Sequence, residues 1–124
     1  MAKRIMITAG EVKVEAELND GPTAKMVAEA LPIKARGSRW GEEIYFEIPV
    51  EADLESDARD VVEAGELGYW PSGNAFCIFF GPTPASRGDE IRAASAVNII
   101  GKVKGDLSQL PGVPNGAQVL IEAD

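Results

Sequence analysis

The sequence predicts a mainly β protein with a single domain, residues 1–124, and three observations lead to that prediction. Short apolar or alternating runs recur roughly every ten residues, with turn-forming residues between them. Gly and Pro number 13 and 8, and they are spread along the chain rather than gathered in a linker. The long strand–helix–strand alternation of a parallel sheet is missing. The expected architecture is an antiparallel barrel or sandwich of about eight short strands with one or two short helices.

The first third of the chain contains two strands and a helix. Arg4–Thr8 is an apolar run with β-branched residues, and Val12–Leu18 alternates apolar and charged residues as half-buried strands do. Thr23 is placed to cap a short helix, which Pro32 ends. The apolar residues of this helix recur at helical spacing and are Ala24, Val27, Ala28 and Leu31.

Two further strands are expected after the helix, at Ile33–Trp40 and Glu43–Val50. In the second strand the apolar and polar residues alternate, which predicts one buried face and one polar face. The apolar set is Ile44, Phe46 and Ile48, and the polar set is Glu43, Tyr45 and Glu47. Glu51–Asp60 is acidic and weakly patterned, so that a solvated loop and one or two helical turns are both open there.

Four more strands complete the count, at Leu67–Trp70, Ala75–Phe80, Ala96–Val103 and Gln118–Glu122. The residues of Ala75–Phe80 are apolar on both faces, with Ala75, Cys77 and Phe79 on one and Phe76, Ile78 and Phe80 on the other. A strand of this kind is covered on both sides. A sheet closed into a barrel with a helix packed outside provides that environment.

The charge balance excludes several classes of partner. Lys and Arg total 12, Asp and Glu total 20, and the net charge is −8. Nucleic-acid binders carry a basic face, and anionic membrane surfaces attract basic segments, so neither partner is expected. No apolar run approaches the roughly 18–20 residues that span a bilayer. We therefore predict a soluble, cytoplasmic protein and leave a homo-oligomer open.

Metal and cofactor chemistry finds little support in the residues. The chain has no His and one Cys, which removes the commonest general base and metal ligand and any intrachain disulfide. Cys77 lies in an apolar run, where a thiol is usually inert. Asp53, Glu55 and Asp57 have the spacing of a calcium loop, but Ala58 and Ala64 occupy the positions that need Gly and Glu. Phosphate-binding glycine motifs are absent. We expect no metal and no cofactor.

Several segments resemble a known family. Trp40–Phe46, Tyr69–Ala75 and Phe79–Pro84 resemble the corresponding segments of the small bacterial and archaeal cyclophilin-like proteins, a family of unknown function. Ala96–Val103 continues the resemblance, which covers nearly the whole chain. The resemblance implies the cyclophilin fold, a closed eight-stranded β-barrel capped by helices.

True cyclophilins, the peptidyl-prolyl isomerases, are similar at fewer positions. Ile100–Val103 resembles one of their strands, and Tyr45–Pro49 occupies the place where they carry a catalytic Arg. Glu47 and Ile48 stand in that neighbourhood here, and Asn74 is the amide nearest to their pocket Gln. The resemblance therefore implies the fold without the isomerase donor, because a fold can be kept while its chemistry is lost.

Candidate binding residues come from two groups and a loop. Tyr69, Trp70 and Asn74 lie at a strand end and turn, where flat amphipathic rings and an amide can grip a ligand. The structural alternative is that Trp70 closes the barrel and Asn74 takes a left-handed turn conformation. The second group is a basic, aromatic wall made of Arg36, Arg39, Trp40 and Tyr45, whose alternative is a surface role with ordinary packing. Phe80 and Arg87 belong to the strand end and to the Gly81–Glu90 loop, for which a flap and a plain crossover are both open.

The leading hypothesis is a module that binds a small molecule or an extended peptide near these aromatic residues. The first alternative is a weak peptidyl-prolyl isomerase. The second is a structural protein that self-assembles through a barrel edge or through the loop.

Overall fold

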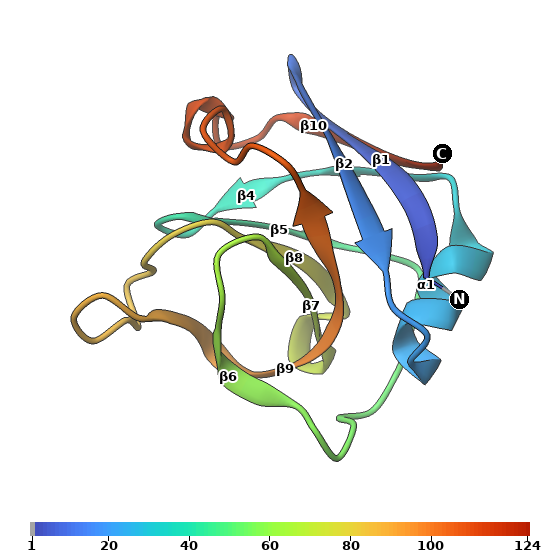
Figure 1. The fold of residues 1–124 in the computed structure, drawn as a ribbon, viewed down its shortest axis with the longest axis horizontal. Helices are drawn as coiled ribbons and strands as arrows, with labels where there is room; N and C mark the ends of the chain where they lie inside the picture. The colour runs from blue at the N-terminus through green and yellow to red at the C-terminus, as the bar shows by residue number, and fades with distance from the viewer. Residues whose placement is uncertain (1) are drawn as a thin grey trace.

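The computed structural model describes residues 2–124 and contains a strongly curved antiparallel sheet with one α-helix beside it (Figure 1). The strands of this part of the chain are β1 Lys3–Ala9, β2 Val12–Leu18, β3 Ile33–Arg36, β4 Ser38–Arg39, β5 Glu43–Glu47, β6 Arg59–Val62, β7 Glu66–Trp70, β8 Ala75–Phe79, β9 Ile91–Lys104 and β10 Gln118–Ala123. The helix α1 spans Pro22–Ala30, and two short 3₁₀ turns span Pro71–Gly73 and Leu110–Gly112. The mainly β architecture predicted from the sequence is confirmed.

The strand order is β3-β10-β1-β2-β9-β7-β8-β5-β4, with β6 paired to β9 beside this path. In residues 2–124 no ladder joins the two end strands, so the closed barrel predicted from the resemblance is not confirmed. The end strands are nevertheless consecutive along the chain, because only Gly37 separates β3 from β4. The Gly37 N–H donates to the Ala117 carbonyl at 2.8 Å, which holds this junction against the start of β10.

The eight expected strands became ten for two reasons. The predicted strand Ile33–Trp40 divides at Gly37, because its first half pairs with β10 and its last residues pair with β5. The strand β6 lies where the sequence favoured a loop or helical turns, since its Arg and Asp gave no apolar pattern. The preceding residues, 51–58, do form a loop.

The main core fills the concave side of the sheet. Its largest fully buried members come from seven strands and a 3₁₀ turn, and Phe46 and Phe76 stack within it with ring centroids 5.2 Å apart. These large side chains are Tyr69, Phe76, Ile5, Ile7, Leu18, Ile44, Leu67, Ile78, Ile100, Leu110 and Ile121. Burying an aliphatic or aromatic side chain stabilises a fold by about 1.5–3 kcal/mol, so this cluster provides most of the driving force.

A second, smaller cluster lies on the outer side of β8. It contains Val62, Ala75, Cys77, Phe79, Ile91, Ala93 and Val97. Every residue of β8 is buried, with Phe76 and Ile78 facing the main core and the alternate residues facing the second cluster. The prediction that this strand is covered on both sides is therefore confirmed. Its outer cover is a two-stranded ribbon formed by β6 and the first half of β9.

Ion pairs hold this ribbon in place. The Arg59 guanidinium donates to both carboxylate oxygens of Glu66 at 2.8 and 2.7 Å, and Arg92 donates to Asp60 at 2.7 Å. Burial raises the pKa of Glu66, but the hydrogen bonds from Arg59 and from the Glu63 N–H, together with the positive charges of Arg59 and Lys102, outweigh that effect, so the pKa lies below its usual value. The charged residues Arg59 and Asp60, which obscured the strand pattern of β6 in the sequence, therefore have ion-pair partners in the folded chain.

The helix α1 begins differently from the prediction. Its N-cap residue is Gly21 rather than Thr23, because Pro22 occupies the first helical position. Thr23 instead lies within the first turn, where its N–H and its hydroxyl both donate to Oε2 of Glu55, at 3.1 and 2.5 Å. A carboxylate 32 positions away in the sequence thus satisfies an amide that the helix leaves free. The helix ends at Ala30, just before Leu31-Pro32, as expected.

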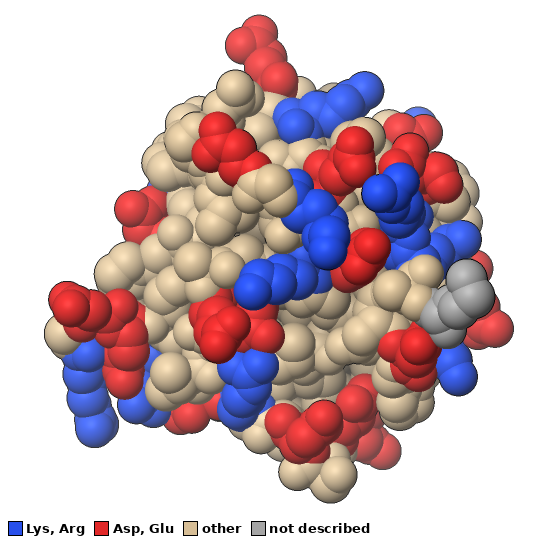
Figure 2. Space-filling model, viewed as in Figure 1, with Lys and Arg blue, Asp and Glu red and all other residues tan. Residues whose placement is uncertain are grey.

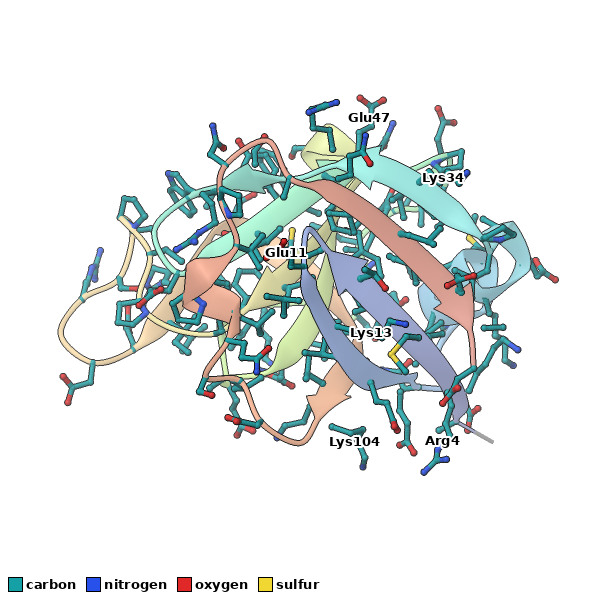
Figure 3. The ribbon with its side chains drawn as sticks, turned by 90° about the horizontal axis from the view of Figure 1, so that it is seen from above. Arg4, Glu11, Lys13, Lys34, Glu47 and Lys104 are labelled. Atoms are coloured by element: carbon teal, nitrogen blue, oxygen red, sulfur yellow. The ribbon has the colours of Figure 1, made fainter. Side chains whose placement is uncertain are left out.

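The surface carries both signs of charge. On the face shown in Figure 2, acidic and basic side chains are interspersed rather than gathered into one basic area. Figure 3 shows Arg4, Lys34, Glu47 and Lys104 extending outward from the sheet. In residues 2–124 no helix has both the length and the apolar character that crossing a membrane requires.

Candidate functional site

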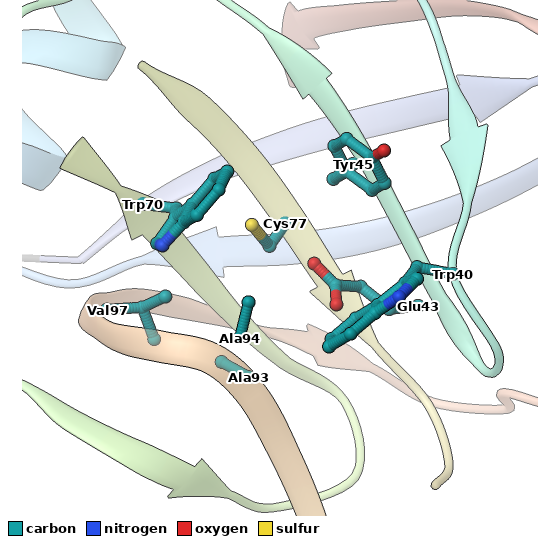
Figure 4. Close-up of a pocket in the computed structure, with 8 residues that line it drawn as sticks. All are labelled: Trp40, Glu43, Tyr45, Trp70, Cys77, Ala93, Ala94 and Val97. Atoms are coloured by element: carbon teal, nitrogen blue, oxygen red, sulfur yellow. The ribbon is translucent and has the colours of Figure 1, made fainter. Parts of the chain in front are cut away.

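A pocket opens on the outer side of the sheet, between β5, β7 and β8 and the first half of β9 (Figure 4). Its volume is about 250 Å³. The lining is mostly apolar and aromatic, with one carboxyl group among the side chains. The lining residues are Trp40, Glu43, Tyr45, Trp70, Cys77, Ala93, Ala94 and Val97.

The alternation of β5 brings Glu43 and Tyr45 to the pocket. Residues of one strand that are two positions apart share a face, and the neighbouring Ile44 and Phe46 turn into the main core. Tyr45 lies directly opposite Cys77 in the β5–β8 ladder. The sheet therefore sets three of the lining side chains on one wall at fixed spacing.

Trp40 reaches the pocket from the turn before β5. The backbone N–H of Trp40 donates to the backbone carbonyl of Glu43 at 3.0 Å, across a turn whose Gly41 has φ +60°. A Cβ at position 41 would lie 2.9 Å from the Thr83 backbone, so this turn is packed tightly against the segment that follows β8. Trp40 is thus presented by a rigid turn.

Trp70 forms the opposite wall at the end of β7. Its indole N–H donates to the Ser95 hydroxyl at 2.6 Å, which fixes the ring against β9. Trp40, Tyr45 and Trp70 are all half-buried, so each ring packs on the protein and leaves part of its surface to the pocket. Figure 4 shows Trp40 and Trp70 at opposite ends, with Cys77 and Glu43 between them.

Glu43 is the unusual member of this lining. Its exposed fraction is 5%, and among residues 2–124 no hydrogen-bond partner meets its Oε1 atom. Burial raises the pKa of this carboxyl to about 7, and the adjacent Cys77 thiol opposes that rise. Burial likewise raises the pKa of the Cys77 thiol well above its ordinary value. The pocket therefore holds a carboxyl that changes charge near neutral pH beside a thiol that stays protonated.

The structure brings together three of the eight residues that the sequence singled out for binding: Trp40, Tyr45 and Trp70. Tyr69 belongs to the main core, fully buried, and its hydroxyl donates to the Val50 carbonyl at 2.6 Å. Asn74 has φ +49° and ψ +42°, which is the left-handed turn conformation weighed as its structural role. Tyr69 lies outside the pocket lining because a strand alternates its faces, so neighbours such as Tyr69 and Trp70 diverge. Asn74 lies outside it at the end of the 3₁₀ turn between β7 and β8.

The remaining three predicted residues lie elsewhere. Arg36 on β3 is exposed and donates to the Gly116 carbonyl at 2.9 Å. Phe80 packs beneath the Arg39 guanidinium, 5.2 Å from it, and Arg39 also donates to the carbonyls of Pro111 and Val113. The expected basic wall therefore does not form beside the aromatic rings.

Arg87 is exposed in the loop after β8. Within this loop the Ser86 hydroxyl accepts hydrogen bonds from the N–H groups of Thr83 and Arg92, and the Thr83 hydroxyl donates to the Arg92 carbonyl. The loop, residues 81–90, contributes no residue to the pocket lining in the described part of the chain. These contacts tie both ends of the loop to each other.

Sequence reasoning missed Glu43. Its position on the same face as Tyr45 was predicted, but that face was expected to be polar and solvated. Glu47, two positions further along, is exposed as expected, whereas Glu43 lies where the β6–β9 ribbon covers the sheet. The sequence of β5 does indicate that Glu43 shares a face with Tyr45. It does not indicate that this face is buried at Glu43, because the covering residues come from other segments.

Comparisons with known proteins agree with this fold. The family model described as cyclophilin-like matches residues 3–122. The solution structure of a hypothetical protein from Archaeoglobus fulgidus is similar, with 41% sequence identity and a TM-score of 0.84 over 99% of this chain and 95% of that chain. No curated protein matches the chain. Since the family model spans nearly the full sequence, this chain belongs to the cyclophilin-like family.

Proposed function

We propose that the protein is a binding module for a small molecule, and that the ligand occupies the pocket between Trp40 and Trp70. The observation that carries the proposal is the arrangement of three half-buried aromatic rings around one cavity. Ligand sites are typically concave and apolar, with a few polar groups that orient the ligand. Here Glu43 and Tyr45 supply those polar groups.

The size of the pocket favours a small molecule over an extended peptide. Its volume of about 250 Å³ is slightly below the range of about 300–1,000 Å³ that is usual for ligand sites. The lining comes from strands that surround the cavity rather than from one open sheet edge. An extended peptide would need a longer groove with paired backbone groups along it.

Rigid walls support binding without a large ordering cost. Trp70 is held by Ser95, and Trp40 stands on a tightly packed turn. Immobilising a mobile side chain on binding costs about 0.5–1.5 kcal/mol of free energy, and a side chain that is already ordered avoids this cost. The pocket is therefore prepared for a ligand in the free protein.

We also propose that the sheet acts as a closed barrel, as the resemblance to cyclophilins implied. The support is that β3 and β4, the two ends of the strand path, are joined through the single residue Gly37. A frame of that kind keeps the pocket walls at constant separation because it has no free edge that can open.

Tryptophan fluorescence tests the proposed function directly. The chain has two Trp residues and both line the pocket, so the intrinsic signal reports on this site alone. A library of small metabolites titrated against the protein is expected to yield compounds that shift the emission saturably. Ala94→Leu should weaken their binding at least tenfold, because Ala94 is exposed at the pocket and a larger side chain would fill it.

Ala123→Leu is the matched control, since Ala123 is also exposed but lies at the end of β10, outside the pocket lining. It should bind the same compounds as the wild type. Equal binding by both variants, or no saturable shift with any compound, would contradict the proposal. Accelerated cis–trans exchange of Xaa-Pro peptides that Ala94→Leu abolishes would favour an isomerase instead.

A further inference from the structure

The carboxyl of Glu43 is a buried acid without a countercharge. In residues 2–124 no Lys or Arg belongs to the pocket lining, and no ion pair of the described chain includes Glu43. Buried charges are normally paired, because an isolated one loses its hydration without compensation. When Glu43 is ionised, residues 2–124 supply no cation to pair with it.

The groups packed around Glu43 leave its charge uncompensated from every side. The titratable lining residues besides Glu43 are Tyr45, on the same strand, and Cys77 on β8. From β9 the lining consists of Ala93, Ala94 and Val97, which are apolar. The nearest strand neighbours therefore supply no cation that could hold the carboxylate.

The walls favour one kind of cation. The face of an aromatic ring attracts a positive charge through its quadrupole, and a Trp ring does so more strongly than a Tyr or Phe ring. Trp40 and Trp70 stand at opposite ends of the pocket with the Glu43 carboxyl between them (Figure 4). A cation in this pocket would lie among aromatic rings and beside one carboxyl group.

The mostly apolar lining favours a cation with few N–H donors. A primary ammonium has three N–H donors, and each needs an acceptor when it is buried. The lining side chains offer the carboxyl of Glu43, the Tyr45 hydroxyl and the weakly accepting Cys77 sulfur. A methylated ammonium has few or no N–H donors, so it loses little by entering an apolar pocket.

Resting on the proposed function, we propose that the ligand is a small organic cation with a methylated ammonium group. Glu43 is its counter-ion, and the three aromatic rings form its walls. The carboxylate is a binding group and performs no chemistry. Where Glu43 is protonated before binding, the proton leaves to solvent as the cation enters.

Choline and its neutral carbon isostere, 3,3-dimethylbutanol, test the proposal as a pair. The two probes have the same shape, and only choline is charged. At pH 8 and constant chloride concentration, choline should shift the Trp emission with a dissociation constant at least tenfold below that of the isostere. Glu43→Gln should bring the two constants to within about twofold of each other.

Glu47→Gln is the matched control. Glu47 lies on the same strand and the same face as Glu43 but is exposed, and it extends away from the sheet in Figure 3. It removes one negative charge from the protein without changing the pocket. It should keep the full preference for choline; loss of the preference in this variant would show that net charge, rather than Glu43, attracts the cation, and would overturn the proposal.

The pH dependence gives a second readout. The charge of choline does not change with pH, whereas Glu43, with a pKa of about 7, has to be ionised to pair with it. Affinity for choline should therefore rise about tenfold from pH 6 to pH 8 in the wild type and stay constant in Glu43→Gln. A flat profile in the wild type would contradict the pairing.

The outcomes separate this proposal from the proposed function. If the isostere binds as tightly as choline, the pocket takes a neutral ligand and the cation is excluded, while the binding function stands. If neither probe binds and no compound of the metabolite library shifts the Trp emission saturably, both proposals fail. Choline binding that Ala94→Leu leaves unchanged would place the cation outside the pocket and overturn the assignment.

Discussion

Two buried polar side chains of this protein differ in one respect, the number of partners they have. Asn98 on β9 is fully buried, and its amide donates to the Thr23 hydroxyl at 3.0 Å and to the Asp53 carbonyl at 2.9 Å. Its carbonyl oxygen accepts from the Glu55 N–H at 2.8 Å. Glu43 on β5 is buried almost as deeply, and its Oε1 has no partner in residues 2–124.

The difference separates structure from binding. The Asn98 group joins β9, the start of α1 and the loop before β6, three segments that are distant in sequence. A satisfied buried network of this kind specifies one arrangement of the chain. Glu43 lines a cavity, and its Oε1 atom has no hydrogen-bond partner in residues 2–124. An unsatisfied buried group costs free energy unless a ligand compensates it. We infer that Asn98 serves the fold and Glu43 serves the site.

The largest effect is expected at Asn98. Asn98→Ala removes both donors and the acceptor at once and leaves the Glu55 N–H and the Asp53 carbonyl without their partner. The free energy of unfolding should fall by about 3 kcal/mol, because each orphaned buried group costs about 1–3 kcal/mol. Urea denaturation at neutral pH measures the change.

Asn19→Ala is the control for that loss. Asn19 also donates to a β9 carbonyl, that of Ile99 at 2.8 Å, but it is exposed, so water can replace its contacts. Its cost should stay under about 1 kcal/mol. Equal losses in the two variants would show that burial does not distinguish them.

The next largest effect is expected at Glu43, where the substitution Glu43→Gln should raise the free energy of unfolding rather than lower it, by an amount that depends on pH. Glu43 has a pKa of about 7 in the folded chain and 4.5 as the ordinary value. Between these values the folded state holds more protons than the unfolded state, so stability falls as pH rises. Above pH 7 both states are ionised and the destabilisation is complete. Relative to Glu43→Gln, the wild type should lose about 2–3 kcal/mol between pH 5 and pH 8.

Urea denaturation of both proteins at the two pH values measures this difference. Glu47→Gln should follow the wild type, since its carboxyl is exposed. A difference between wild type and Glu43→Gln that does not change with pH would mean that burial leaves the Glu43 pKa where it is in the unfolded chain.

A smaller effect is expected at Thr23, which shares the Asn98 network. Thr23→Val keeps the shape of the side chain and removes a hydroxyl that donates to Glu55 and accepts from Asn98. The cost should be about 1–2 kcal/mol, because Asn98 keeps its bond to the Asp53 carbonyl. Thr8→Val on β1 is the control: no side-chain hydrogen bond of Thr8 occurs within residues 2–124, and no loss is expected beyond about 0.5 kcal/mol. A loss at Thr8 as large as that at Thr23 would contradict the role of the network.

The smallest effect is expected at the pocket wall. Ser95→Ala removes the acceptor that holds the Trp70 indole N–H at 2.6 Å. Stability should change by under about 1 kcal/mol, since both groups can reach water. The Trp fluorescence anisotropy decay should show a more mobile ring, and ligand affinity should fall a few-fold. An unchanged decay would show that packing rather than this bond fixes Trp70.

Much of the fold could be predicted because short-range patterns in the sequence determine many of its strands and the end of its helix. The alternation of Val12–Leu18 and the two apolar faces of β8 identify strands directly, since side chains of a strand alternate with a period of two. The end of α1 before Leu31-Pro32 follows from steric restriction at a single residue. Of the five aromatic residues predicted for the site, Trp40, Tyr45 and Trp70 lie together at the pocket, whereas Tyr69 and Phe80 do not line it.

What the sequence by itself determined is which residues share a face; only the tertiary structure decided what covers each face. Tyr69 and Trp70 are adjacent in the chain, yet one fills the core and the other lines the pocket. Glu43 became a buried acid because the β6–β9 ribbon covers one end of the outer face of β5. That ribbon is held by ion pairs such as Arg59 with Glu66, whose charges look like those of a solvated loop until the partners meet. The physical reason is that periodicity is a property of one strand, whereas burial depends on segments that the chain brings back from elsewhere.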